Sequence, residues 1–146
     1  MSRISFLLSL LLVFCFAFTP NLSAQEQGYE VVEYMKVLPG QRDNYLAAEK
    51  IWRKIHQHRL EQGKIRFWYI FQVLSPGGTD TEYDYMVVTG YKNWDAIEEL
   101  RLNWRENMPE MTEDDIAVLQ NTGKTRNLVK REIWRTHDRL TRNPNQ

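Results

Sequence analysis

Cysteine is nearly absent: the 146 residues hold one, Cys15, which lies in the apolar opening of the chain. The residue before it, Phe14, is not the small residue that a lipoprotein processing site requires. If the opening is removed, the mature protein has no thiol. Disulfide frameworks, thiolate metal sites and cysteine nucleophiles are then excluded together.

An excess of charge of either sign is also absent, because 19 lysines and arginines stand against 19 aspartates and glutamates. The two kinds of charge are interleaved, and no basic block occurs. Nucleic acids and anionic membrane surfaces are recruited by net positive patches. The sequence therefore argues against a nucleic-acid partner and, once the opening segment is removed, against a membrane partner.

Sequence motifs for cofactors are missing. The chain has no Gly-rich phosphate loop, no flavin or nicotinamide fingerprint and no recognisable Ser-His-Asp spacing. Its histidines are His56, His58 and His137. Helical side chains two positions apart diverge by about 200°, so His56 and His58 cannot hold one metal ion. We predict neither a cofactor nor a metal site.

Residues 1–24 have the layout of a secretory signal peptide, with Arg3, an apolar run and the small residues Ser23 and Ala24 before the cut. The apolar run has roughly 15 residues, whereas a membrane span needs about 20. An uncleaved anchor is the alternative interpretation. We expect an exported protein, either periplasmic or secreted.

Residues 25–137 are expected to form one domain, followed by a polar tail at 138–146. Runs rich in β-branched and aromatic residues predict strands, and apolar residues spaced by three and four predict helices. The expected strands are 29–37, 66–74, 83–91 and 127–136, and the expected helices are 42–62, 93–104 and 108–123.

Capping residues mark the expected helix ends. Asp43 or Asn44 is available as the N-cap of the first helix, with Gly63 as its stop. Asn93 is the expected cap of the second helix and Thr112 that of the third.

The stretch "RFWYIFQVL" at 66–74 is apolar on both of its faces. The element order βαββαβ predicts an α+β, ferredoxin-like fold with a four-stranded antiparallel sheet and helices on one face. The other face then needs a cover, which a second copy of the sheet would supply. We therefore predict a homodimer.

The segments "YMKVLPGQRDNYLAAEKIW" and "YDYMVVTGYKNWDA", with an aromatic strand between them, resemble the dimeric α/β-barrel superfamily. The antibiotic-biosynthesis monooxygenase, EthD and NIPSNAP families belong to it. The resemblance covers nearly all of the mature chain and implies two sheets that face each other across a dimer and enclose a pocket. It does not settle activity, because the superfamily includes enzymes and proteins of no known catalysis. The Asn, Trp and His set of its haem-degrading branch has no counterpart that we can place here.

Glu33 and His56 are the candidate catalytic residues. Glu33 lies among apolar strand neighbours, where desolvation would raise its pKa as a general base requires. Alternatively, it pairs with Arg66 or Arg131 on a neighbouring strand. His56 lies at the border of the apolar stripe of its helix, where it either bonds at the rim or reaches a pocket and works as an acid or base.

A small apolar or aromatic molecule in the barrel lumen is the expected ligand, since aromatic walls with a few polar groups are typical of ligand sites. The candidate ligand-binding residues are Glu33, His56, Trp68, Tyr85 and Trp134. The aromatic residues alternatively serve as core and interface. Ligand binding by an exported homodimer is the first functional hypothesis, and the alternative is a cofactor-independent monooxygenase that acts on an aromatic substrate.

We predict that the mature chain begins near Gln25, because a signal peptidase cleaves after small residues such as Ala24. Intact-mass analysis of protein from the native host checks this. A mass that includes residues 1–24 contradicts it.

Overall fold

The computed structural model describes residues 28–74 and 82–138. The expected signal peptide at 1–24, most of the loop between the second and third strands, and nearly all of the expected tail lie outside the described residues. Signal cleavage and export therefore stay predictions. Within the described ranges, no helix combines the length and the apolar character needed to cross a membrane.

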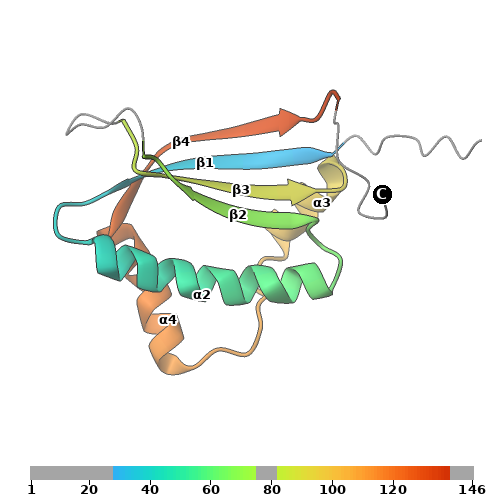
Figure 1. Cartoon of the computed structure of the whole chain (residues 1–146). Helices are drawn as coiled ribbons and strands as arrows, with labels where there is room; N and C mark the ends of the chain where they lie inside the picture. Colours follow the sequence, from blue (N-terminus) through green and yellow to red (C-terminus); the bar gives the residue numbers. More distant parts are fainter. Residues whose placement is uncertain (1–27, 75–81, 139–146) are drawn as a thin grey trace, which may run out of the picture.

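Four strands form one antiparallel sheet in the order β2-β3-β1-β4 (Figure 1). The strands are β1 (Tyr29–Val37), β2 (Phe67–Gln72), β3 (Tyr85–Tyr91) and β4 (Arg126–Arg135). Helix α2 (Arg42–Glu61) connects β1 to β2, and the connection from β3 to β4 contains α3 (Trp94–Leu102), α4 (Glu113–Gln120) and the short 3-10 helix η1 (Thr122–Lys124). This order and connectivity are those of the ferredoxin-like fold, so the predicted fold class is confirmed.

The helices lie on one face of the sheet, and the core forms there (Figure 1). Tyr45 of α2 is fully buried against Met35, Tyr85 and Val87 of the two central strands. A second cluster packs α3 against the sheet, and its buried members are Ile65, Tyr91, Ile97 and Leu100. Helix α4 packs against α2 instead of the sheet, where the ion pair from Lys54 to Asp115, at 3.0 Å, joins the two helices.

Helix α2 begins at Arg42, as its spacing predicts, but its N-cap lies two to three residues before the predicted one. Its N-cap is Gln41, which makes no side-chain cap, so the prediction of Asp43 or Asn44 was wrong. The cause is the turn before it: Gly40 has φ +73° and leads the chain directly into the helix, which places Asn44 inside the first turn. The predicted stop is confirmed, because Gly63 has φ +67° and its N–H donates to the carbonyl of Leu60 at 3.0 Å.

The other two predicted caps are confirmed. The side chain of Asn93 accepts a hydrogen bond from the N–H of Ala96 at 2.9 Å. That of Thr112 accepts one from the N–H of Asp115 at 3.1 Å. Each cap satisfies one of the free N–H groups at a helix start and so fixes where α3 and α4 begin.

Strand β2 presents aromatic side chains to both faces of the sheet, as its sequence predicts. Trp68 pairs with Thr89 and points toward the helices, whereas Phe67, Tyr69 and Phe71 point to the outer face. The three outer rings follow one another with centroid distances of 5.1 and 5.9 Å. Tyr69 and Phe71 are 53% and 46% exposed.

Beneath this outer aromatic row lies a small apolar layer, in which Val32 and Val88 are buried. Gly90 allows the ring of Phe67 to lie directly over the backbone, since a Cβ there would be 2.3 Å from a ring carbon. The outer face is therefore well packed close to the sheet, but it leaves large aromatic surfaces uncovered.

Candidate functional site

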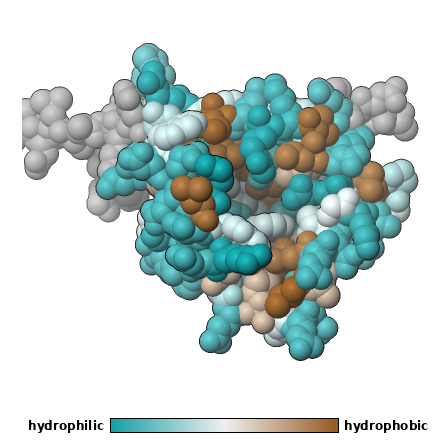
Figure 2. Space-filling view, turned by 180° about the vertical axis from the view of Figure 1, so that it is seen from behind, coloured by the Kyte–Doolittle hydropathy of each residue, from teal (hydrophilic) through white to brown (hydrophobic). Residues whose placement is uncertain are grey.

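A cleft of about 460 Å³ lies between the sheet and the helices. It opens beside β4, because α3 is only nine residues long and α4 packs on α2. The helix-facing Leu128 and Ile133 of β4 are consequently 44% and 43% exposed. The view from behind shows hydrophobic side chains around a recess in this face (Figure 2). Residues of its wall include Glu33, Trp68, Leu128 and Ile133 of the sheet, Glu49, Trp52, His56 and Arg59 of α2, and Leu100, Arg101 and Trp104 of α3 and the loop after it.

The position of this cleft differs from the expectation of a pocket between two sheets. A lumen between sheets would lie on the outer face, whereas the cleft lies on the helix-facing side and is formed within a single chain. The physical reason is that the helices do not cover the whole of the sheet. Four strands exceed what α2 and the short α3 can span, so the space over β4 stays open.

An aromatic stack forms the inner wall of the cleft. The ring of His56 lies on Trp68, with centroids 5.3 Å apart and planes 17° apart. The ring centroid of Trp52, one helical turn earlier, lies 6.1 Å from that of His56. Positions 52, 56 and 59 follow the i, i+4, i+7 spacing, which brings the three side chains of α2 to the same face of the helix. The wall thus has flat surfaces with a cationic side chain at one end.

His56 is buried and uncharged at neutral pH. Burial, assisted by the nearby charge of Arg59, lowers the pKa of His56 from 6.5 to about 3. Its Nδ1 has no hydrogen-bond partner among the described residues, and the same holds for the indole N–H groups of Trp52 and Trp68. Buried polar atoms without partners lower the stability of the folded protein, so the packing of this wall stabilises the fold less than its apolar contacts alone would.

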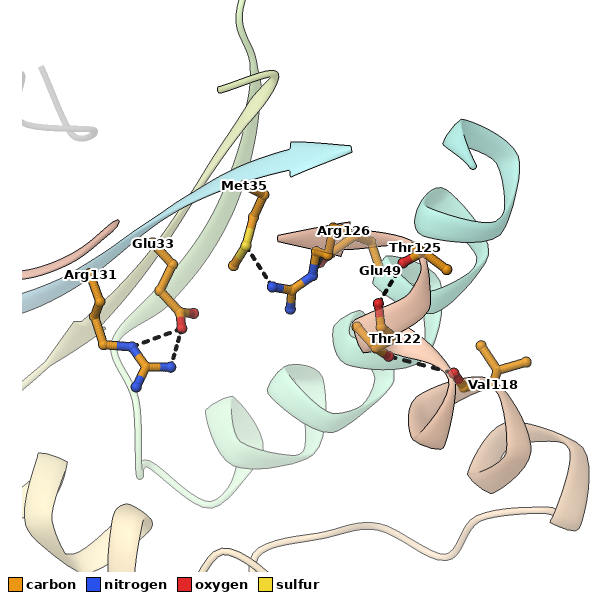
Figure 3. A network of polar contacts seen from close by, with 8 residues as sticks. All are labelled: Glu33, Met35, Glu49, Val118, Thr122, Thr125, Arg126 and Arg131. Atoms are coloured by element: carbon orange, nitrogen blue, oxygen red, sulfur yellow. Dashed lines mark hydrogen bonds and ion pairs between the residues drawn. The ribbon is translucent and has the colours of Figure 1, made fainter. Parts of the chain in front are cut away.

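Each of the three carboxylates that line the cleft has an arginine partner. The Nε of Arg131 donates to Glu33 at 3.0 Å, and Arg101 pairs with Glu98 at 2.7 Å. The structure thus places Glu33 in the ion pair with Arg131 that the sequence left open as an alternative to catalysis. Figure 3 shows this pair approaching from β1 and β4.

Glu49 and Arg126 form the third, looser pair. Their side chains approach to 3.8 Å, which is too long for a hydrogen bond, and both atoms are buried. Burial raises the pKa of Glu49, while the charge of Arg126 opposes the rise. Arg126 also contacts the sulfur of Met35 (Figure 3). Glu49 is not among the residues predicted from the sequence, where its only signal is its place beside the apolar stripe of the helix.

Arg59 is the cleft cation with no carboxylate partner in the described ranges. Its side chain is 7% exposed, and its Nε donates one hydrogen bond, to the backbone oxygen of Asn107 at 3.3 Å. Burial lowers the pKa of Arg59 from its usual range. The spacing of three and four along α2, from Tyr45 through Ile55, brings Arg59 to its buried face. That spacing does not show which residues lie opposite Arg59.

Two of the predicted ligand-binding residues lie outside the cleft. Tyr85 is buried in the core against Tyr45, with ring centroids 4.9 Å apart, and its hydroxyl accepts from Arg42 at 3.3 Å. Trp134 lies opposite Glu30 on the outer face and donates to Glu132 at 3.2 Å. The structure thus brings Glu33, His56 and Trp68 together, but not these two. In the part of the chain that the structure describes, no group of three or more His, Cys, Asp or Glu side chains could hold a metal ion.

No protein-family model matches the sequence, and no curated protein gives a significant match. Several solved structures resemble it distantly, among them the following three. A dimeric ferredoxin-like protein of unknown function from Bacteroides fragilis has 12% identity over 77% of this chain and 96% of that chain, with a TM-score of 0.46. Another dimeric ferredoxin-like protein of unknown function, from Thermobifida fusca, has 12% identity over 77% and 92%, with a TM-score of 0.46. SnoaB, a cofactor-independent oxygenase from Streptomyces nogalater, has 10% identity over 79% and 96%, with a TM-score of 0.43.

We expect His56 to make the folded protein less stable as the pH falls. The unfolded chain takes up the proton near pH 6.5, whereas the folded chain takes it up near pH 3. Between these values the unfolded state therefore binds more protons, and stability falls by at most about 1.4 kcal/mol per pH unit from this group. Glu49 acts in the opposite direction, because its pKa is raised in the folded state.

The measurement compares urea unfolding of wild type and His56→Gln between pH 4 and 7. In His56→Gln, the free energy of unfolding should fall less steeply with decreasing pH than in the wild type. His58→Gln, at a more exposed position of the same helix, should keep the slope of the wild type. Equal slopes in wild type and His56→Gln contradict the assignment.

Proposed function

We propose that the protein is an exported homodimer that binds a small, planar, largely apolar molecule in the cleft of each chain. The stacked pair of His56 and Trp68 is the observation that carries this proposal. It offers a rigid flat wall, and the cleft volume of about 460 Å³ lies within the usual range for small-molecule sites. Export rests on the signal-peptide pattern at 1–24.

The open side of the cleft supports the same proposal. Leu128, Ile133 and Trp104 are each more than two-fifths exposed, although all three face the cleft. A flat molecule that lay between these side chains and the wall of α2 would remove apolar surface from water on both of its faces. Each Å² of apolar surface buried in this way contributes roughly 25 cal/mol before the costs of association are subtracted.

The cleft favours binding over catalysis by His56. An imidazole whose pKa has fallen to about 3 is a weak base at neutral pH, whereas general-base catalysis works best with a pKa near the working pH. His56 therefore serves as a neutral stacking surface in this proposal.

We predict that an aromatic ligand of the cleft raises the unfolding midpoint of the mature protein. The gain is roughly 2.7 kcal/mol when the free ligand is at a hundredfold of its Kd. A thermal-shift screen of planar aromatic compounds measures it. Leu128→Asp places a charge in the cleft and should abolish the shift, whereas Leu102→Asp, an exposed leucine outside the cleft, should retain it. A screen without any shift, or a shift unchanged in Leu128→Asp, contradicts the proposal.

The homodimer is proposed from the outer face of the sheet. The exposed row of Tyr69 and Phe71 continues from the half-buried Phe67, and Trp134 adds an exposed ring on the same face. Contiguous exposed aromatic surface of this kind is typical of interfaces. Two such sheets would pack at about 10 Å, with the aromatic rows between them.

We predict that Tyr69→Lys converts the dimer to a monomer, because it places a charge in the middle of the aromatic row. A stable dimer should bury on the order of 1,600 Å² or more. Light scattering coupled to size exclusion reports the mass. Leu102→Lys, which adds the same charge on the helix side, should stay dimeric. A folded monomeric wild type contradicts the dimer but leaves the cleft proposal intact, since one chain forms the cleft.

A further inference from the structure

We propose that the ligand of the cleft is an aromatic carboxylate whose anionic group pairs with Arg59. This inference rests on the proposed binding function and specifies the chemical class of the ligand.

The side chains that line the cleft carry one more positive charge than negative charges. Four arginines and three carboxylates line it: Arg59, Arg101, Arg126 and Arg131 against Glu33, Glu49 and Glu98. Three arginine–carboxylate pairs account for all three carboxylates. One positive charge is left over, and it belongs to Arg59.

The charge of Arg59 is also buried. Arg59 is 7% exposed, and the described residues supply it with one hydrogen bond, from Nε to the backbone of Asn107. A guanidinium carries five N–H donors, and a buried cation without an anion is costly. Arg59 lines the cleft, and its terminal nitrogens have no hydrogen-bond partner among the described residues and are not fully buried. A ligand anion would compensate this charge.

The geometry of helix α2 selects the shape of the ligand. Arg59 lies three residues after His56, so it is about 4.5 Å further along the helix axis. A ring that lies against the stack of His56 and Trp68 would carry its charged group toward Arg59 if that group is attached directly or through one atom. A planar carboxylate matches the two parallel N–H bonds of a guanidinium. The two features together indicate a flat aromatic acid.

The experiment compares 2-naphthoate with its neutral analogue 2-naphthamide on the mature wild-type protein, by calorimetric titration at pH 7 and low salt. We expect the naphthoate to bind at least tenfold more tightly. Arg59→Gln should bring the two probes to within about twofold of each other. Arg53→Gln removes an arginine from the exposed side of the same helix and should leave the tenfold difference in place.

Equal binding of the two probes by the wild-type protein overturns the anion proposal but leaves the binding function standing. A preference for the naphthoate that persists in Arg59→Gln overturns the role of Arg59. If Arg59→Gln does not fold, Arg59→Lys decides: it keeps the charge without the fork of donors, and an unchanged Kd for the naphthoate would contradict bidentate pairing. A thermal screen in which no aromatic compound shifts the midpoint overturns the binding function itself.

Discussion

The packing of helix α2 across the sheet is the constraint on which both the core and the cleft depend. Its inward stripe begins with Tyr45, which is fully buried among the central strands, and continues through His56 to Arg59. The first part of the stripe forms the core. The later part faces the open space beside β4, because α3 is too short to close it. One helix therefore stabilises the fold at one end and presents polar groups to a cleft at the other.

The cleft combines apolar walls with polar groups that the chain itself does not satisfy. The indole N–H of Trp52 and that of Trp68 lack partners, and Arg59 lacks a carboxylate. Such groups reduce stability, and a core selected for stability alone would replace them with apolar side chains. Their concentration where one face of α2 meets Trp68 of β2 is the reason to regard this region as a site and not as a packing defect.

The two faces of the sheet have different tasks, and β2 shows how one strand contributes to both. Trp68 supplies the wall on which His56 stacks, while Phe67 and Tyr69 point away from the helices. Glycine at position 90 lets the ring of Phe67 lie close to the backbone, so the outer aromatic row begins flat against the sheet. In our proposal, the helix side binds the ligand and the outer side binds the second copy.

The sequence by itself determined the elements, because their signals are local: β-branched and aromatic residues for β1, the spacing of apolar residues for α2, and the caps Asn93 and Thr112. The element order then determined the ferredoxin-like topology. Only the tertiary structure decided which alternate side chains of β2 point toward the helices. It also decided that the cleft lies beside β4 and that Arg59 has no carboxylate partner there. These features depend on contacts between residues far apart in the chain. An arginine on the buried face of a helix can lie opposite a carboxylate or an open cleft. Which of the two it meets depends on the strands that pack against the helix, and the local sequence pattern does not predict it.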